Sequence, residues 1–445
     1  MAKKIKVLWA SDINSATGFG TVSYALIPRL QDTGKYEFVG MGINYRGVRF
    51  PGMHIYQCDS QDVYGFNLFP AVARREKPDL VFALQDLFVT FKWFEALREV
   101  APETPTVLYF PIDGNSTPPH WLNCVRQATV PVAYSEYGRQ LVEERAPDQK
   151  GRIELIYHGA ETDLFKPLSE ANRDHIRSLN NVSDRFVVGV INRFQPRKLV
   201  PLAIRAFSLM YNGYKKCHKC GNYYLASLGK CDLNFCEGGE HDEIVPPKPE
   251  MFLYLHCNIE EHMMGGPANS LAMSWETAGI KKADGCIMTP GVDIYGPQTP
   301  PKEEMPNIYG MLDCYLAVDC GEGYGLTQME ALSCGIPVVK SSSTTGPELV
   351  GKFGHMVKSS AFFSMPYDSG HFRPVVAVHD VVDQLEEVYA EWLANGRKTK
   401  LSQEQHKHVV KNFNWDNIAK QFDNVFQKAL EAPVNNRRSI QMARV

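Results

Sequence analysis

Short apolar runs alternate with amphipathic stretches along the first third of the chain. The apolar runs lie at 5–10, 38–42, 80–84, 106–110 and 130–134. Helical spacing of apolar residues fills most of the intervals, as at 91–100 and 138–145. Strands of a sheet that helices cover on both faces are apolar throughout. The pattern therefore predicts a mainly parallel sheet covered by helices.

The alternation resumes at residue 186, after a polar run at 166–185 where we place the hinge between two domains. Further strands are expected at 186–191, 251–256, 286–289 and 314–318. Further helices are expected at 200–210, 270–277, 303–311 and 380–392, with a last helix that ends near residue 430. The predicted fold class is α/β, with two Rossmann-like domains at 1–165 and 166–415.

The richest candidate chemistry lies between Asp319 and Val339, where the sequence reads DCGEGYGLTQMEALSCGIPVV. A loop with three glycines, the last being Gly325, leads into helical spacing that starts at Leu326. Glycines before a helix N-terminus let backbone N–H groups approach a ligand, and the helix dipole favours an anion there. This arrangement predicts a phosphate-binding loop.

Two carboxylates, Glu322 and Glu330, bracket this loop. Carboxylates accept hydrogen bonds from sugar hydroxyls, so the pair suits a nucleotide sugar. An exposed glutamate at the start of a helix and a second, solvated one would explain the same spacing.

A second glycine-bearing loop follows the first predicted strand. It runs from Asp12 past Gly18 and Gly20 into a helix that extends through Leu30. Ligands of doubly wound sheets bind at the carboxyl ends of the strands, so this loop is a candidate for the same site. A plain tight turn also accounts for the glycines.

Composition narrows the class of protein. With 445 residues, of which 44% are hydrophobic and 22% charged, the chain is ordinary for a soluble globular protein of two or three domains. A net charge of −3 provides no global basic field for nucleic acid. No apolar run reaches the ~20 residues of a membrane span. The chain starts with MAKKIKVLWAS, whose apolar run is too short for a secretory signal. We therefore expect a cytoplasmic protein.

Four of the eleven cysteines are clustered within a segment at 212–247. Cys217 and Cys220 form one pair, and Cys231 and Cys236 form another. Two such pairs suit tetrahedral ligation of a structural Zn²⁺, with His218 and His241 as substitute ligands, although free thiols remain an alternative. Lysines and tyrosines surround the pairs, and such residues contact nucleic acid in other proteins. A zinc-stapled lid or interface is the simpler interpretation.

The segment 319–339 resembles the E-x₇-E signature of glycosyltransferase family 4, whose members are retaining enzymes of the two-domain GT-B fold. Glu322 and Glu330 stand at the two glutamate positions, and Arg193 and Lys198 match a basic pair of the family. The resemblance implies sugar transfer from a nucleoside-diphosphate sugar to a hydroxyl, without a catalytic metal. The family core does not need the segment at 212–247, which we therefore interpret as a zinc-knuckle insertion. The resemblance implies a terminal helix at 416–432 that crosses back to the first domain, and the polar residues at 433–445 are expected to form a flexible tail.

The resemblance also assigns roles on the donor side. Glu322 would hold sugar hydroxyls and Glu330 the ribose, while Arg193 and Lys198 would stabilise the leaving diphosphate. The backbone at Gly325 and Leu326 would hold the diphosphate or the sugar, and Gly18 and Gly20 would shape the cleft. Arg197, next to Lys198, is expected to be exposed.

The acceptor side departs from the family. Many members carry a His-Asp pair after the strand at 106–110, whereas this chain has Asp113 and no histidine there. Asp113 is a candidate base for the acceptor hydroxyl, and a simple Asp-Gly turn is an equal alternative. His158, in a segment that resembles the crossing between domains, and Asp12 are the other acceptor-side candidates.

The sequence gives only indirect evidence for the identity of the acceptor. The strings TGFG and GINYRG, together with the cysteine-bearing insertion, resemble viral family members that glycosylate hydroxymethylated bases of DNA. The predicted acceptor is therefore a modified base in DNA, and a glycan, lipid or protein hydroxyl is the conservative alternative. A non-catalytic protein that binds nucleotide sugars is a third possibility, favoured by the missing histidine.

Overall fold

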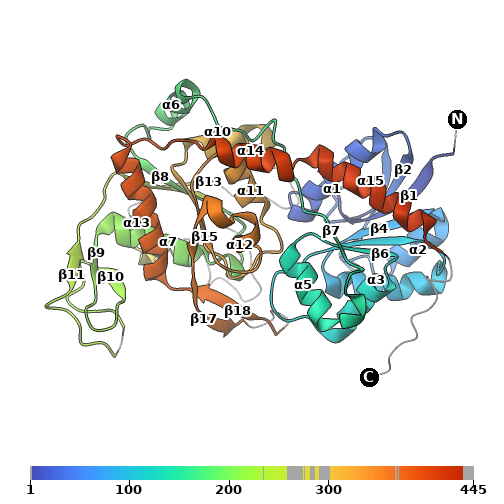
Figure 1. Cartoon of the computed structure of the whole chain (residues 1–445), viewed down its shortest axis with the longest axis horizontal. Coiled ribbons are helices and arrows are strands. Elements are labelled where there is room, and N and C mark those ends of the chain that lie inside the picture. Colours follow the sequence, from blue (N-terminus) through green and yellow to red (C-terminus); the bar gives the residue numbers. More distant parts are fainter. Residues whose placement is uncertain are drawn as a thin grey trace.

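The structure is a computed structural model that describes residues 3–233, 235–257, 274, 276–280, 286–289, 301–365, 368 and 370–433. Two parallel β-sheets, each covered by helices, lie side by side along the longest axis of the molecule (Figure 1). The predicted two-part α/β architecture is confirmed. The predicted tail beyond residue 433 and the predicted start of a helix at 270 lie outside the described residues.

The first sheet has seven strands in the order β3-β2-β1-β4-β5-β6-β7, all of them parallel. The strands are β1 (Ile5–Asp12), β2 (Tyr36–Ile43), β3 (Met53–Gln57), β4 (Leu80–Leu84), β5 (Thr106–Phe110), β6 (Val130–Ala133) and β7 (Glu154–Leu155). The helices of this half are α1 (Gly18–Gln31), α2 (Leu68–Glu76), α3 (Leu87–Val100), α4 (Asn123–Gln127) and α5 (Glu136–Arg145). Every residue of β4 and β5 is buried, which explains why their sequences are continuous apolar runs.

The second sheet has six parallel strands in the order β13-β12-β8-β14-β15-β16. The strands are β8 (Phe186–Ile191), β12 (Met251–His256), β13 (Cys286–Thr289), β14 (Cys314–Ala317), β15 (Val338–Ser341) and β16 (Gly354–Val357). The helices are α6 (Glu170–Leu179), α7 (Val200–Asn212), α10 (Met305–Met311), α11 (Leu326–Ser333), α12 (Gly346–Leu349), α13 (Val378–Ala394) and α14 (Gln403–Asn412).

The polar run at 166–185, where the sequence placed a hinge, contains helix α6. Arg173 and Arg177 of α6 are buried and bind the two carboxylate oxygens of the fully buried Asp313, at 2.7 and 2.9 Å. The pairing compensates the cost of burying these charges, so the polar residues in this run serve to dock a helix.

Two small antiparallel sheets are attached to the second half (Figure 1). One consists of β9 (Tyr214–Lys216), β10 (Tyr223–Leu225) and β11 (Glu243–Val245), and it belongs to the cysteine-bearing insertion. The other is the hairpin of β17 (Ser359–Ser364) and β18 (Phe372–Val376), which the apolar pattern did not predict. β17 is largely exposed, and β18 mixes buried, half-buried and exposed positions, so neither strand has the continuous apolar run of a fully buried strand.

The last helix, α15 (Trp415–Glu431), lies against the first sheet although it follows the second half in sequence (Figure 1). Phe422 and Phe426 on its buried face contact the ring of Phe82 in β4, with both pairs of ring centroids 5.7 Å apart. Asp423 accepts a hydrogen bond of 2.6 Å from the Tyr36 hydroxyl. The apolar stripe of α15 therefore completes the core of the first half.

Side chains of the second half also contact backbone groups of the first. Glu348 in α12 accepts hydrogen bonds from the N–H groups of Glu136 and Tyr137, at 3.1 and 2.9 Å, and so caps the N-terminus of α5. Arg373 in β18 donates to the carbonyl of Asp113 at 2.6 Å. The two halves are thus held together directly at the edge where their strands end.

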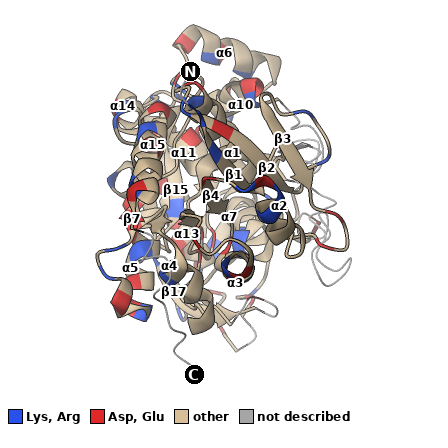
Figure 2. Ribbon diagram, turned by 90° about the vertical axis from the view of Figure 1, so that its right-hand side faces the viewer, with Lys and Arg blue, Asp and Glu red and all other residues tan. Residues whose placement is uncertain are grey.

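Charges of both signs are intermixed over the molecule, as along α5 in Figure 2. This distribution agrees with the small net charge of −3. Among the described residues, no helix combines the length and apolar character that a membrane crossing requires.

Candidate active site

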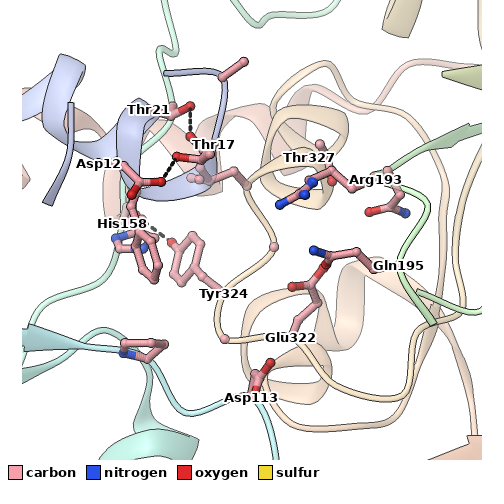
Figure 3. A pocket seen from close by; sticks show the side chains of 18 of the residues that line it. Asp12, Thr17, Thr21, Asp113, His158, Arg193, Gln195, Glu322, Tyr324 and Thr327 are labelled. Atoms are coloured by element: carbon pink, nitrogen blue, oxygen red, sulfur yellow. Dashed lines mark hydrogen bonds between the residues drawn. The ribbon is translucent and has the colours of Figure 1, made fainter. Parts of the chain in front are cut away.

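A cavity of about 600 Å³ lies between the two halves, and residues of both form its walls. We call its two sides the first-domain wall and the second-domain wall. The first-domain wall includes Asp12, Thr17, Gly18, Asn44, Tyr64, Gln85, Asp86, Asp113, Tyr134 and His158. The second-domain wall includes Arg193, Gln195, Arg197, Lys198, Met305, Glu322, Tyr324, Gly325, Leu326, Thr327 and Glu330. Figure 3 shows the two walls facing each other.

The glycine loop of the second-domain wall leads directly into helix α11. Gly325 precedes the helix with a φ of 91°, a left-handed conformation that favours glycine. The first N–H groups of an α-helix have no partner within the helix, so those after Gly325 are available to an anion in the cavity. Asp319 and Lys340 form a buried ion pair beneath the loop and hold its start in place.

Glu322 is buried and bound by two cations of the same wall. Its carboxylate contacts the ammonium of Lys198, and the guanidinium of Arg197 donates to it at 3.1 Å. Burial and the neighbouring Arg197 lower the pKa of Lys198 well below its usual value. A further anion at this position would favour the protonated lysine again, because opposite charges stabilise each other strongly in a buried site. Arg193 points into the cavity next to this group (Figure 3).

The prediction that Arg197 is exposed was wrong. Its side chain is 26% exposed and bridges three partners: Glu322, the carbonyl of Gly321 at 2.9 Å and the carboxylate of Asp113 at 3.5 Å. The residue occupies a short 3₁₀ turn whose position over the loop only the folded chain defines. Arg197 therefore joins the two walls.

Glu330, on α11, lines the cavity and accepts a hydrogen bond of 2.8 Å from the hydroxyl of Tyr309. Burial raises its pKa, while Lys302 and the bond from Tyr309 act in the opposite direction. One carboxylate oxygen thus has a protein partner, and the group is placed to accept a hydroxyl from a ligand as well.

Asp12 stands at the end of β1 and is held by neighbouring side chains of the first-domain wall. Thr17 donates to its carboxylate at 2.5 Å, and the amides of Asn44 and Gln85 donate at 3.3 Å. Burial raises the pKa of Asp12 to about 6, although these hydrogen bonds oppose the shift. The Thr17–Asp12 bond is visible in Figure 3.

The two glycines of this loop differ. Gly18 begins α1 and lines the cavity, with no atom within 4 Å of the position that a Cβ would take. A Cβ on Gly20 would lie 2.2 Å from the carbonyl oxygen of Ser15, so this glycine allows the loop to fold tightly. Gly20 is not among the residues that line the cavity.

His158 lines the cavity as a neutral, packed side chain. Its Nδ1 lies 2.7 Å from the Tyr109 hydroxyl, and the Tyr324 hydroxyl donates to its backbone carbonyl at 2.6 Å. Burial lowers its pKa to about 3. A histidine in this state offers shape and a hydrogen bond to a ligand, but it carries no charge at neutral pH.

Asp113 lies in the cavity opposite Glu322 (Figure 3). Burial alone would raise its pKa, but Arg197, Arg373 and His371 lower it, and the net shift is downward. Both arginines approach its carboxylate at 3.5 Å. A carboxylate with a lowered pKa is a weak base, so the geometry favours an electrostatic link between the walls over the predicted role as a base.

Sequence reasoning missed Arg373 and Asp86. Arg373 comes from the unpredicted hairpin and is 2% exposed, bound to Asp368 and Asp113. Asp86 stands two residues after the predicted strand at 80–84 and immediately before α3, which begins four residues earlier than the helix predicted at 91–100. A charged residue at the carboxyl end of a strand is a usable signal for a ligand site, and it singles out Asp86 as it does Asp12 and Asp113.

The four clustered cysteines come together in the insertion. Their Sγ atoms all lie within 4.8 Å of one another, with Cys217 and Cys236 3.4 Å apart and Cys220 and Cys231 3.7 Å apart. Tetrahedral Zn²⁺ with Zn–S bonds of about 2.3 Å places its sulfurs about 3.8 Å apart, so the residues fit such an ion. The ring of His218 is instead bound to Asp242 at 2.5 Å.

The tyrosines of the insertion mostly serve packing. Tyr214 and Tyr224 are buried, and Tyr214 stacks on Tyr223 with ring centroids 5.0 Å apart. The hydroxyls of Tyr214 and Tyr223 bind Glu386 and Asp383 of α13, at 3.1 and 2.8 Å. These contacts attach the insertion to the second half and leave the stacked rings unavailable to nucleic acid bases.

Comparison with known protein families finds glycosyltransferases, the class that the segment 319–339 resembles. Residues 258–364 match the family described as Glycosyl transferases group 1. A stretch of 54 residues is 43% identical to the O-antigen chain mannosyltransferase B of Escherichia coli. This stretch covers 12% of the chain and 14% of the length of that relative.

Solved structures resemble nearly the whole chain. The Anabaena protein Alr3699/HepE in complex with UDP-glucose aligns with a TM-score of 0.64 at 14% identity, over 95% of this chain and 99% of its own. Sucrose-phosphate synthase from Thermosynechococcus elongatus aligns with a TM-score of 0.64 at 13% identity, over 97% and 100%. Likeness at this low identity shows the fold, which is the GT-B fold of two Rossmann-like halves.

Proposed function

We propose that this protein transfers a sugar from a nucleoside-diphosphate sugar to an acceptor hydroxyl, with retention of anomeric configuration. The observation that carries the proposal is the second-domain wall, where Arg193, Lys198, Glu322 and the N-terminus of α11 converge on one cavity. Cations and a helix N-terminus suit a diphosphate, and carboxylates suit sugar hydroxyls.

In this proposal the donor diphosphate competes for the cations that now bind Glu322. Lys198, with its lowered pKa, holds its proton firmly once the diphosphate lies beside it. Glu322 is then released to accept hydrogen bonds from the sugar, and Glu330 accepts from the ribose. Arg193 and Lys198 stabilise the charge that develops on the leaving diphosphate, the task that a divalent metal performs in other enzymes.

UDP-glucose is the first donor to test, because the structure of the Anabaena relative contains it. For the insertion we propose a structural Zn²⁺ held by Cys217, Cys220, Cys231 and Cys236, none of which lines the cavity. Four thiolates close the coordination sphere and leave no position for a substrate. A viral origin, a cytoplasmic location and a DNA acceptor stay predictions of the sequence.

The test is a panel of nucleotide sugars incubated with the zinc-replete protein, followed by mass spectrometry of donor and products. Wild-type protein is expected to hydrolyse or transfer at least one donor. Lys198→Ala and Glu322→Gln should each reduce its turnover by about 100- to 1000-fold, the usual loss when a preorganised electrostatic group is removed.

Matched controls come from the exposed ion pair of Lys352 and Glu404, whose side chains are 76% and 77% exposed. Lys352→Ala and Glu404→Gln should leave turnover unchanged. Near-normal turnover by Lys198→Ala and Glu322→Gln would contradict the proposal. Donor binding without any turnover by wild-type protein would favour the non-catalytic alternative.

A further inference from the structure

Three aspartates line the first-domain wall at the carboxyl ends of three adjacent strands. Asp12 ends β1, Asp86 follows β4 by two residues, and Asp113 follows β5 by three. The sheet order places β1, β4 and β5 next to one another. The connections leave the sheet in opposite directions on the two sides of the β1–β4 boundary, which is where ligands of doubly wound sheets bind.

The carboxylates of Asp12 and Asp113 already have partners among the described residues, and that of Asp86 has none among them. Three side chains donate to Asp12, and two arginines approach Asp113. Within the part of the chain that the structure describes, no hydrogen bond or ion pair ends on the Asp86 carboxylate. Although Asp86 is the N-cap residue of α3, its side chain makes no capping bond.

Asp86 is half-buried, and a carboxylate that loses part of its hydration without gaining a donor is costly to the folded state, unless a ligand supplies the missing hydrogen bond. Asp86 lies on the cavity surface, so a hydroxyl that enters the cavity can supply it. Burial raises the pKa of Asp86 to about 7, and the charges of Asp113 and Asp12 act in the same direction while Arg197 opposes them. Near neutral pH the group is therefore able to take a proton, which Asp113 is not.

We propose that Asp86 binds the acceptor hydroxyl and receives its proton, and that the acceptor is a neutral, hydroxyl-rich compound of the carbohydrate class. This inference rests on the proposed glycosyl transfer. The acceptor oxygen forms a bond to the anomeric carbon of the donor sugar on the face that the diphosphate leaves, so the configuration is retained. The bond from that carbon to the diphosphate oxygen breaks, its electron pair leaves with the diphosphate, and the acceptor proton passes to Asp86.

The chemistry of the whole wall argues for a neutral acceptor. Besides the three aspartates it presents the amides of Asn44 and Gln85, and carboxylates with amides are the groups that bind sugar hydroxyls. The same carboxylates repel the phosphates of a nucleic acid. The cations of the cavity belong to the second-domain wall, where Glu322 already engages Lys198 and Arg197. A DNA acceptor would therefore meet an unfavourable field at the point of transfer.

The test uses full-length, zinc-replete protein with the donor identified by the panel. Asp86→Asn should lower donor turnover by about 100-fold, since acid–base groups contribute roughly 100- to 10,000-fold. The Kd for UDP should change less than twofold, because Asp86 lies on the other wall. Wild-type turnover should fall as pH drops below about 7, and this dependence should vanish in Asp86→Asn. If Asp86 had only a structural role, turnover by Asp86→Asn would still fall as pH drops below about 7; we call this fall the acid limb of the pH profile.

Asp148→Asn is the matched control, since Asp148 is an exposed first-domain aspartate paired with Arg126. For the acceptor class, methyl glucosides, maltose and cellobiose are compared with a duplex oligonucleotide that contains 5-hydroxymethylcytosine. Glycosylated saccharides, or donor turnover that the saccharides change and the oligonucleotide does not, support the inference. Saccharides without any effect, or sugar on the oligonucleotide alone, overturn the neutral acceptor.

The outcomes separate this inference from the function on which it rests. If wild-type protein turns over no donor, both fall. If wild-type protein turns over a donor and Asp86→Asn keeps the same rate and the same acid limb, only the role of Asp86 falls.

Discussion

The two walls of the cavity have opposite electrostatic character. The second-domain wall carries Arg193, Arg197 and Lys198 beside a helix N-terminus. The first-domain wall carries Asp12, Asp86 and Asp113, two of which have raised pKa values. A donor that brings two phosphates needs the first kind of wall, and a neutral acceptor that must lose a proton needs the second. The difference indicates that each wall is built for one of two chemically unlike substrates.

The walls also differ in how the chain supplies them. The residues of the second-domain wall come mainly from two short stretches, 191–198 and 322–330, whereas those of the first-domain wall come from the ends of several separate strands. The two walls touch at Gly321, Arg197 and Arg373, so their relative position depends on a few close contacts.

The largest effect on donor turnover is expected from adding a side chain at the point where the two walls touch. A Cβ on Gly321 would lie 2.2 Å from the Asp113 carbonyl oxygen and 2.6 Å from a guanidinium nitrogen of Arg373. Gly321→Ala should therefore push the walls apart and lower donor turnover by about 100-fold, as misplacements of about 1 Å do. Steady-state kinetics with the active donor measure the loss.

Gly229→Ala is the control, since a Cβ there would meet no atom within 4 Å. Wild-type turnover by Gly321→Ala would show that the walls do not meet in this way during transfer.

A smaller effect is expected on thermal stability, because the charged form of Asp86 on the first-domain wall destabilises the folded protein. The folded protein raises the pKa of Asp86 from 3.8 to about 7, so the stability that its protonated form contributes is present below pH 4 and lost as pH rises through 7. Asp86→Asn should raise Tm by several degrees at pH 8 and by less at pH 5, because each pKa unit corresponds to about 1.4 kcal/mol.

Thermal unfolding at the two pH values measures the difference. Asp148→Asn should show no such gain at pH 8, because Arg126 lowers the pKa of Asp148 in the folded state. An equal Tm gain of Asp86→Asn at both pH values would contradict the electrostatic cost.

The smallest effect on transfer is expected from removing the metal of the insertion. Chelation of zinc should lower Tm by a few degrees, because small metal sites derive folding energy from their ion. A loss of 1 kcal/mol shifts Tm by roughly 2–4 °C in domains of about 150–250 residues. Donor turnover should stay within about twofold of the untreated protein. None of the four cysteines lines the cavity.

Cys220→Ser tests the same point without a chelator, and elemental analysis measures zinc in both proteins. Zinc-free wild-type protein with an unchanged Tm would favour free thiols. A large loss of turnover on chelation would tie the insertion to the cavity.

Much of the architecture was predictable from the sequence, because it depends on local patterns. Buried parallel strands are apolar throughout, so most of the central strands of both sheets were predicted within two residues of their bounds, including β4, β5 and β8. The loop before α11 was equally visible, since a glycine loop, a helix and the residues that face the ligand are contiguous there. Glu322 is a candidate because of that contiguity, whereas Arg193 and Lys198 were candidates because they match a basic pair of the resembling family.

The tertiary structure decided what depends on residues distant in sequence. It placed Arg373 of an unpredicted hairpin on Asp113 and turned Arg197 from the surface into the contact between the walls. It also left Asp86 near Asp12 and Asp113 without a side-chain partner among the residues that the structure describes. No local pattern contains these facts, because pKa values and ion pairs depend on distances between side chains from different strands. The amino-acid sequence by itself therefore determined two α/β halves and predicted a phosphate-binding loop, and folding determined which side chains from distant segments meet around that loop.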